Sequence, residues 1–346
     1  MKNRRIVLAS RPSGIPVPAN FTLVEETMRE LKNGEVLLEN LVFAIDPATR
    51  GMLDDRESYL PSVALGGLVP TMVLGRVVQS RNANFKEGDL GRGYAGWEEY
   101  SILDPANIAL ERVTADSRVP LTTYMGALGW SGFTAYIGLK KIGQMASSET
   151  VVMSAAAGAV GSVCGQIARL CGNRAVGIVG GAEKASIVTE QLGMDAAVNY
   201  RTAGDLAAAI RDACGGGADI YFDNVGGRTL ETMLPLMRDH GRVVVCGMVS
   251  DYNNAHDPYP VHTLWQVLVH RITMCGFLAY EHTEMLAEAE CALTDWIVSG
   301  RLKPLENVTT SLENTPAAFI RLMSGKTVGK TVVRLNEGVS AWTSHP

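Results

Sequence analysis

From Gly143 onward the sequence alternates short apolar runs with segments of helical periodicity, and this alternation restricts the fold more than any other feature. The strand candidates are nearly continuous in apolar residues and lie at 150–154, 174–179, 196–200, 219–223, 242–247 and 271–277. Between them, apolar residues recur at spacings of three and four over 162–171, 183–193, 204–214 and 228–240, which predicts helices. Strands that are apolar on both faces and separated by helices predict an α/β domain, a doubly wound parallel sheet of six strands. The run 271–277 is expected at its edge.

The chain up to about residue 125 has a different pattern. Short apolar runs are separated by turns rich in Gly, Pro and Asp, at 34–45, 68–80, 93–103 and 107–113. Such runs are typical of an antiparallel, barrel-like β domain. The run 330–336 is again strand-like, so the end of the chain is expected to rejoin the first domain. The sequence therefore predicts a β-barrel domain from 1–125 and 306–346 and a parallel-sheet domain from 126–305.

Composition excludes several classes of protein. A net charge of −5 argues against a nucleic-acid partner, which requires a basic face. No apolar run approaches the roughly 20 residues that cross a bilayer, and the apolar run 6–9 is too short for a signal peptide. The six cysteines show no Cys-x-x-Cys spacing, as in reduced cytosolic proteins. We therefore expect a cytoplasmic protein without a nucleic-acid or membrane partner.

The turn after the first strand of the parallel-sheet domain has the composition of a dinucleotide site. The segment 154–172 reads SAAAGAVGSVCGQIARLCG and contains the pattern A-x-G-x-x-G at Ala156, Gly158 and Gly161. Small residues let the backbone approach a pyrophosphate, and the following helix N-terminus presents N–H groups to it. The alternative is an ordinary small-residue turn between a strand and a helix. The strand–helix alternation around it favours the cofactor site.

The end of the second strand indicates which dinucleotide binds. An NAD site carries an acidic residue there, which accepts a hydrogen bond from the ribose 2′-OH. Here Gly180 and Gly181 occupy that place, Lys184 follows, and Arg201 could add a second positive charge. Glu183 is the counter-argument, but it lies one turn into the helix. The sequence therefore predicts NADP(H), the alternative being that Lys184 is only an exposed lysine at a helix start.

Motifs along nearly the whole chain resemble those of the zinc-independent medium-chain reductases. Besides the glycine stretch they are NGEVLLENLVFAIDPATRG (33–51), GWSGFTAYIGL (129–139), DNVGG (223–227), CGMVSDYN (246–253) and ENTPAAFIRLMSGKTVGKTVVR (313–334). That family includes prostaglandin/leukotriene B4 reductases, alkenal double-bond reductases and bacterial curcumin reductase. The resemblance implies a GroES-like domain, a Rossmann domain, and NADPH-dependent reduction of the C=C bond of α,β-unsaturated ketones or aldehydes. It also implies a homodimer formed by pairing of Rossmann sheet edges.

Carried over by position, the resemblance implies a set of cofactor contacts. The pyrophosphate would lie against Ala157, Gly158, Ala159, Val160 and Gly161. The 2′-phosphate would meet Lys184 and Tyr200, and Asn224 would meet the ribose and nicotinamide side. The loop after the fifth strand would contribute Cys246, Gly247, Met248, Val249, Ser250 and Tyr252, and the nicotinamide end would be closed by Phe277, Leu278 and Ala279. Thr327 stands where the family often has an asparagine near the cofactor.

The substrate side departs from the family pattern. Ala48 and Val269 replace two tyrosines of the family, so the pocket is expected to differ in shape and to lose hydroxyl donors. The substrate range is therefore not carried over with the resemblance. Tyr59 and Tyr94 are alternative pocket residues.

The first 150 residues contain neither Cys nor His. Zinc alcohol dehydrogenases of this superfold place their ligands there, and a four-coordinate zinc site built from carboxylates alone would be unusual. We therefore expect no metal and a reaction that needs only a neutral donor for the enolate oxygen. Tyr252 is the candidate, unless its ring only packs on the cofactor ribose; the ribose 2′-OH is a further possible donor. The other functions that the sequence leaves open are an NADPH quinone reductase of the same superfold and a non-enzymatic NADPH-binding protein.

Overall fold

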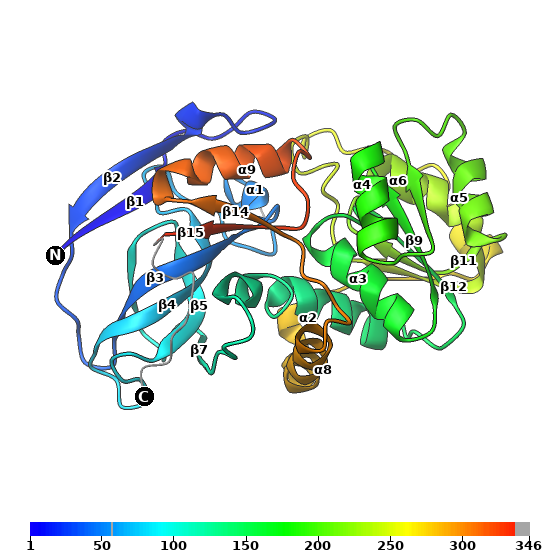
Figure 1. Ribbon diagram of the computed structural model, residues 1–346. Coiled ribbons are helices and arrows are strands. Elements are labelled where there is room, and N and C mark those ends of the chain that lie inside the picture. Colours follow the sequence, from blue (N-terminus) through cyan, green and yellow to red (C-terminus); the bar gives the residue numbers. More distant parts are fainter. Residues whose placement is uncertain (57, 336–346) are drawn as a thin grey trace. The chain divides into compact units, whose positions relative to one another are not determined.

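The computed structural model describes residues 1–56 and 58–335 (Figure 1). The chain divides into two compact units. One contains Met1–Gly126 together with the chain from Glu306 onward, and the other is Ala127–Leu305. Each unit has its own sheet and its own buried core.

The unit Ala127–Leu305 is built on a parallel sheet of six strands in the order β10-β9-β8-β11-β12-β13. The strands are β8 (Thr150–Met153), β9 (Arg174–Val179), β10 (Ala196–Asn199), β11 (Ala218–Asp223), β12 (Met237–Val245) and β13 (Thr273–Gly276). The chain runs outward from β8 to β10 and then returns to β11 on the other side of β8. This order confirms the doubly wound sheet and the prediction of an edge strand at β13. Ligands of such sheets bind beyond the carboxyl ends of the strands, where the order reverses.

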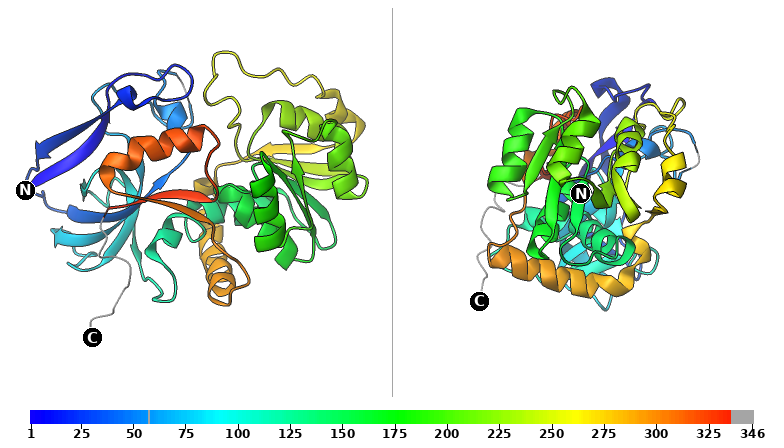
Figure 2. Two further views of the ribbon diagram at one scale, coloured as in Figure 1. Left: turned by 45° about the horizontal axis from the view of Figure 1, so that its top comes forward. Right: turned by 90° about the vertical axis from the view of Figure 1, so that its right-hand side faces the viewer.

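Helices cover both faces of this sheet (Figure 1). They are α2 (Trp130–Ile137), α3 (Ala159–Leu170), α4 (Ala182–Ser186) with a π-helical turn at Ile187–Gln191, α5 (Leu206–Cys214), α6 (Gly227–Met233), α7 (Trp265–Val269) and α8 (Leu286–Val298). One core joins Tyr221 of β11 to Ile210 of α5 and Met233 of α6. Against the other face, the ring of Phe222 lies so close to Gly138 that a Cβ there would be 2.5 Å away. Helix α8 packs on α2 (Figure 2).

The predicted helix 228–240 is wrong beyond its first two turns. Helix α6 ends at Met233, a 3-10 turn covers Leu234–Leu236, and Met237 already pairs with Ala218 of β11. Pro235 explains the early end, because a proline has no N–H to continue the helical hydrogen-bond series. The apolar residues that give this stretch its helical spacing pack into the buried core against the sheet instead.

The other unit carries a seven-stranded barrel-like sheet in the order β14-β15-β3-β4-β5-β7, with β6 on β3, and a separate ribbon of β1 and β2. The strands are β1 (Lys2–Leu8), β2 (Phe21–Thr27), β3 (Val36–Ile45), β4 (Pro70–Ser80), β5 (Leu90–Gly96), β6 (Tyr100–Leu103), β7 (Leu110–Val113), β14 (Glu306–Thr310) and β15 (Lys330–Arg334). Nearly all pairs are antiparallel, which confirms the GroES-like β prediction. The predicted run 93–103 is divided between β5 and β6. Residue 336, at the end of the last predicted run, lies outside the described residues.

An aromatic cluster anchors the core of this unit. The Trp97 ring centroid lies 5.4 Å from that of Phe21 and 5.6 Å from that of Phe319. Phe319 belongs to α9 (Thr315–Met323), which precedes β15. Because β15 then pairs with β3, the end of the described chain belongs to the same sheet as the strands of the N-terminal part.

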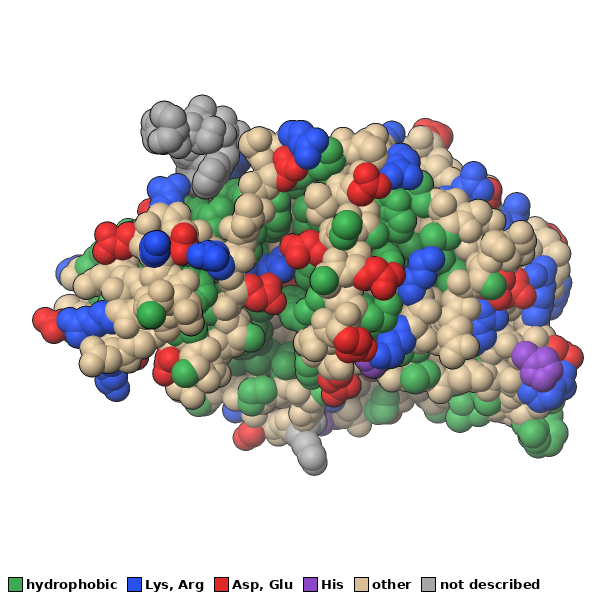
Figure 3. All heavy atoms as spheres, turned by 90° about the horizontal axis from the view of Figure 1, so that it is seen from below, with side chains coloured by type: hydrophobic (Ala, Val, Ile, Leu, Met, Phe, Trp, Pro, Cys, Tyr) green, Lys and Arg blue, Asp and Glu red, His purple; other side chains and the backbone are tan. Residues whose placement is uncertain are grey.

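The surface drawn in Figure 3 carries acidic and basic side chains interspersed. Among the helices of residues 1–56 and 58–335, none has the length and apolar character needed to cross a bilayer.

Candidate active site

The turn between β8 and α3 brings backbone groups to the place where a pyrophosphate is predicted. Gly158 enters α3 from an extended conformation, and Ala155 lies in the left-handed region with φ of 48°. A Cβ on Gly161 would be 2.4 Å from the carbonyl oxygen of Ala155, so the close contact of turn and helix requires glycine there. Partial exposure is found at Gly158, Ala159 and Val160, whereas Ala157 and Gly161 are buried. An anion can therefore approach the first N–H groups of this twelve-residue helix.

Cationic and phenolic groups meet beyond the ends of β9 and β10. The Tyr200 hydroxyl lies close enough to Gly180 that a Cβ there would be 2.6 Å from it, so a side chain at residue 180 would displace the phenol. The Arg201 guanidinium lies 5.8 Å from the Tyr200 ring centroid. Burial, and then the positive charge of Arg201, lower the pKa of Lys184. Lys184 and Arg201 are electrostatic neighbours, and Arg201 lies beside the Tyr200 ring. Two cations and a phenol form a donor set that suits a phosphate monoester, because charge-assisted hydrogen bonds to phosphate are strong. This end of the sheet therefore fits the 2′-phosphate of NADP(H).

A buried polar cluster joins the ends of β8 and β11. The Ser154 hydroxyl donates to Asp223 Oδ1 at 3.0 Å and accepts from the Asn224 N–H at 2.8 Å. The Asn224 amide Nδ2 donates to the Ser154 carbonyl at 2.8 Å. Asn224, predicted to meet the cofactor, is thus also tied to the residue that precedes the glycine turn. The sequence prediction missed Ser154 and Asp223 as contributors to the site.

The loop after β12 lies along the turn that follows β11. The N–H groups of Cys246 and Gly247 donate to the Asp223 carbonyl at 2.8 and 3.1 Å. The N–H of Ser250 and its hydroxyl both donate to the Val225 carbonyl, at 3.1 and 2.7 Å. The Val249 N–H donates to the Asn224 carbonyl at 3.3 Å. The structure thus brings the predicted loop 246–250 beside the predicted Asn224.

Tyr252 is half-buried on this loop. Its hydroxyl lies over the start of the same loop, where a Cβ on Gly247 would be 3.3 Å away.

Two other side chains of the loop point to its surroundings. The side chain of Met248 contacts Gly226, whose φ of 70° requires glycine. Burial raises the pKa of the Cys246 thiol to about 12, so this thiol stays protonated at neutral pH and is a poor nucleophile.

The residues after β13 are more enclosed than those of the loop. The Phe277 ring meets Phe222 edge-on, with 6.4 Å between centroids. Leu278 is half-buried and Ala279 is buried. Phe277 therefore contributes to the packing of β11 and α2 as well as to the sheet end where the cofactor is predicted.

The remaining predicted residues belong to the barrel-like unit. Tyr94 of β5 donates through its hydroxyl to the Met52 sulfur at 3.4 Å. Burial, then Asp46 and Tyr59, raise the pKa of Tyr94 to about 12. The two tyrosines are thus electrostatic neighbours, with 38% and 51% of Tyr94 and Tyr59 exposed. Thr327 is buried in the turn between α9 and β15.

Comparison with known proteins places this geometry in a family. Residues 4–110 match the family described as the N-terminal domain of oxidoreductase, and residues 159–294 match that described as zinc-binding dehydrogenase. The chain is 39% identical to the NADPH-dependent curcumin reductase of Escherichia coli, over 96% of this chain and 97% of that protein. It is 35% identical to the NADP(+)-dependent 2-alkenal reductase of Nicotiana tabacum, over 97% and 98%. The chain belongs to the zinc-independent medium-chain dehydrogenases/reductases. It is an NADP(H)-dependent reductase of the curcumin, alkenal and prostaglandin reductase branch.

A solved structure of the family agrees with this membership. The crystal structure of CurA in complex with NADPH, from Vibrio vulnificus, superposes with a TM-score of 0.90 at 36% identity, covering 96% of this chain and 99% of that one. Among the described residues of this reductase, no group of three or more His, Cys, Asp and Glu side chains is arranged to hold a metal ion.

Proposed function

We propose that the protein reduces the C=C bond of α,β-unsaturated ketones and aldehydes, with NADPH as the hydride donor. The observation that carries the proposal is the near full-length match to reductases named for curcumin and for 2-alkenals. A second line of support is the donor set at the ends of β9 and β10, which suits NADP(H). Because the first 150 residues lack Cys and His, activation of the carbonyl is assigned to protein hydroxyls.

The reductase's own residues would hold the cofactor and orient it. NADPH, when bound, supplies a hydride for the β-carbon of the substrate. Lys184, Tyr200 and Arg201 would bind the 2′-phosphate, and the start of α3 would bind the pyrophosphate. The loop 246–250 and Asn224 would border the nicotinamide side. Thr327 remains a predicted cofactor residue of the resemblance.

A hydroxyl donor must stabilise the enolate oxygen that forms as the hydride arrives, and the enolate must then take up a proton at the α-carbon to give the saturated product. We assign this role to Tyr252, which follows the loop beyond β12 and is half-buried. Tyr94 is a second neutral donor, since a pKa of about 12 keeps its hydroxyl protonated at physiological pH. Tyr59 lies near it and would shape the substrate side.

We also propose that the reductase is a homodimer joined through β13. One edge of this strand has no strand partner among the described residues. The segment just before it exposes large apolar side chains, with 67% of Trp265 and 64% of Leu268 accessible. Such a cluster beside an open sheet edge is typical of an interface. The cytoplasmic location stays a prediction of the sequence.

The deciding experiment measures NADPH oxidation at 340 nm with an alkenal, an aryl enone and a quinone, and with NADH as the control cofactor. The expected result is turnover of the alkenal and the enone to saturated products that keep their carbonyl groups. Tyr252→Phe is then expected to lower kcat with little change in the NADPH dissociation constant. Turnover of the quinone alone would replace the proposal by a quinone reductase, and NADPH binding without any turnover would point to a non-enzymatic protein.

A further inference from the structure

Asp223 is the last residue of β11 and is completely buried. One of its carboxylate oxygens, Oδ1, accepts hydrogen bonds from the Tyr221 hydroxyl at 2.7 Å and from the Ser154 hydroxyl at 3.0 Å. It also accepts from the backbone N–H groups of Val225 and Gly226, both at 3.0 Å. The other oxygen, Oδ2, is buried without a hydrogen-bond partner among the described residues. Burying a carboxyl group in this way costs free energy, and the four donors to one oxygen offset it.

The donors to Asp223 come from segments that border the cofactor site. Ser154 precedes the glycine turn, and its hydroxyl also holds the N–H of Asn224. Val225 and Gly226 form the turn after β11, where Gly226 and Gly227 have φ of 70° and 51°. Successive backbone N–H groups in such a turn form a concave anion-binding nest, and here the anion is the side chain of the same turn. The carboxylate thus fixes the backbone that carries Asn224.

The second border of the site depends on the same turn. Cys246 and Gly247 donate to the Asp223 carbonyl, and Ser250 donates twice to the Val225 carbonyl. A Cβ on Gly227 would be 2.7 Å from the Ser250 hydroxyl, so loop and turn are in close contact. A change in the turn at residues 223–227 would therefore displace the loop 246–250 as well.

We propose that Asp223 is a positioning residue for cofactor binding, which sets the relative placement of the turn 224–227 and the loop 246–250 without contacting NADPH. Because no atom of the carboxylate is accessible, it acts only through the backbone that it holds. The link to NADPH rests on the proposed function, whereas the effect on the two segments does not.

The test substitutes Asp223→Asn, which keeps the shape and one oxygen but removes the charge. Asp219→Asn is the matched control, because Asp219 lies at the other end of the same strand, away from the candidate site. There it accepts hydrogen bonds from the Thr150 N–H at 2.8 Å and from Arg238 at 2.6 Å. Two measurements are made on each purified full-length variant. One is the NADPH dissociation constant from protein fluorescence, and the other is amide hydrogen exchange of the cofactor-free protein.

For Asp223→Asn we expect the NADPH dissociation constant to rise about tenfold, since hydrogen bonds to a charged acceptor are roughly twice as strong as neutral ones. Faster exchange is expected at 224–227 and 246–250. Asp219→Asn is expected to leave both unchanged at the site even if it lowers stability. A purely structural role for Asp223 would lower the stability of Asp223→Asn and leave the NADPH dissociation constant of the folded variant unchanged.

A folded Asp223→Asn protein with wild-type affinity and wild-type exchange would overturn the proposal. If that variant does not fold, Ser154→Ala takes its place, since it removes the link between Asp223 and the Asn224 N–H; unchanged exchange and affinity in it would be equally decisive. If the wild-type protein itself does not bind NADPH, the proposed function fails. The exchange measurement on the cofactor-free variants still decides whether Asp223 positions the two segments.

Discussion

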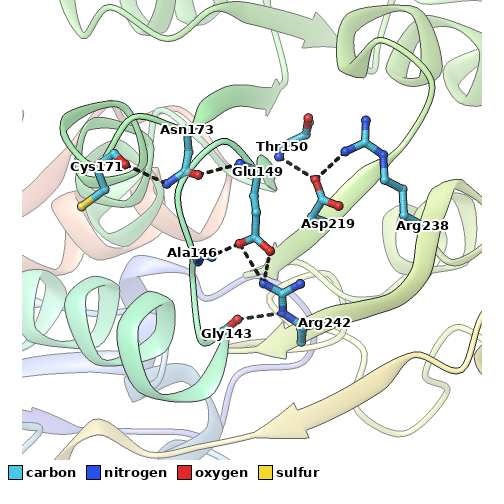
Figure 4. Close-up of polar contacts among 9 residues, drawn as sticks. All are labelled: Gly143, Ala146, Glu149, Thr150, Cys171, Asn173, Asp219, Arg238 and Arg242. Atoms are coloured by element: carbon cyan, nitrogen blue, oxygen red, sulfur yellow. Dashed lines mark hydrogen bonds and ion pairs between the residues drawn. The ribbon is translucent and has the colours of Figure 1, made fainter.

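Arg242 and Glu149 form a two-point ion pair near the amino-terminal ends of the parallel strands, on the side of the sheet away from the candidate site. One guanidinium nitrogen of Arg242 donates to both carboxylate oxygens of Glu149, at 2.6 and 2.8 Å, and the Nε of Arg242 donates to the Gly143 carbonyl at 2.9 Å (Figure 4). The Glu149 N–H in turn donates to the Asn173 side chain at 2.9 Å. Asp219 joins β11 to the same end of the sheet through Thr150. The pair therefore ties the beginning of β8 to β12 across β11.

Substituting Glu149→Gln is expected to destabilise the protein by about 2 kcal/mol, because a largely buried guanidinium would lose its charged partner. Both side chains of the pair keep only about a fifth of their surface exposed. The measurement is the free energy of unfolding from urea titrations. Asp295→Asn, which breaks the exposed pair with Arg301, is the control and should change it by less than about 0.5 kcal/mol. Equal effects of the two substitutions would contradict the structural role of Glu149.

Lys184→Ala is expected to weaken NADPH binding by about tenfold or more while leaving NADH binding nearly unchanged, because a charge-assisted contact is worth about 1.5–3 kcal/mol. Arg201→Ala should act in the same direction but less, since Arg201 is exposed. Dissociation constants of NADPH and NADH, measured by calorimetry, distinguish a loss of 2′-phosphate binding from a general loss of cofactor binding. An equal loss of NADH affinity in Lys184→Ala would show that this lysine does not read the 2′-phosphate.

Gly161→Ala is expected to abolish NADPH binding or to destabilise the Rossmann unit by about 1–3 kcal/mol, because backbone atoms cannot move away from the new Cβ as a flexible side chain can. That Cβ would lie 2.4 Å from the Ala155 carbonyl and 2.8 Å from the Ala156 Cα. Gly51→Ala is the control, since a Cβ there would make only ordinary contacts at 3.8 and 3.9 Å with the side chains of Arg56 and Ser58. Thermal unfolding and NADPH titration of both variants make the comparison. Normal cofactor affinity in Gly161→Ala would mean that the turn is looser than the structure shows.

The sequence predicted the sheet well because buried parallel strands are continuous apolar runs that need no knowledge of distant contacts. It failed where one residue reverses a local pattern. The apolar spacing of residues 228–240 is helical, yet Pro235 ends the hydrogen-bond series and the following residues extend β12. The helical period alone could not locate that end.

The polar cluster at Asp223 could not be found from local pattern at all. Ser154 and Asp223 are 69 residues apart, and each reads as the ordinary polar end of an apolar strand. Only the pairing of β8 with β11 brings them together. Likewise the sequence predicts Tyr59 and Tyr94 as separate pocket residues, whereas the fold makes them electrostatic neighbours with Asp46 close by. The spacing of residues predicts which of them share one face of a helix or strand. Contacts between the ends of different strands follow from the sheet topology instead.

Glu35 should make the stability of the barrel-like unit depend on pH in the acid range. Two Arg29 nitrogens donate to its carboxylate at 2.6 and 2.8 Å, and this pairing, aided by the Lys32 N–H, lowers the pKa of Glu35 to about 2 from an ordinary value of 4.5. The folded state thus binds its proton less readily than the unfolded state. The stabilisation is fully present above pH 4.5 and is lost as the pH falls toward 2. Unfolding titrations of Glu35→Gln between pH 7 and 3 should show a flatter acid limb than the wild type.

Arg29→Ala provides the internal check on that prediction. Removing the guanidinium should raise the pKa of Glu35 most of the way back to its ordinary value. The dependence of stability on pH should then flatten at acid pH to a similar extent as in Glu35→Gln. Adding Arg29→Ala to Glu35→Gln should then change the pH dependence little further. A double variant that differs from Glu35→Gln as much as the wild type does would show that another group causes the effect.

The proposed dimer predicts that charge placed beside β13 separates the subunits. Trp265→Lys with Leu268→Lys puts two ammonium groups on side chains that expose 67% and 64% of their surface, so the monomer should fold normally while the buried interface becomes costly. Size-exclusion chromatography with light scattering should give twice the chain mass of 37.1 kDa for the wild type and the single chain mass for the variant. Leu65→Lys, at a leucine that is 61% exposed in the other unit, is the control and should stay dimeric. A monomeric wild type at micromolar concentration, or a double-lysine variant that remains dimeric, would rule out an interface at this edge, and an equal response of Leu65→Lys would attribute the separation to added charge rather than to β13.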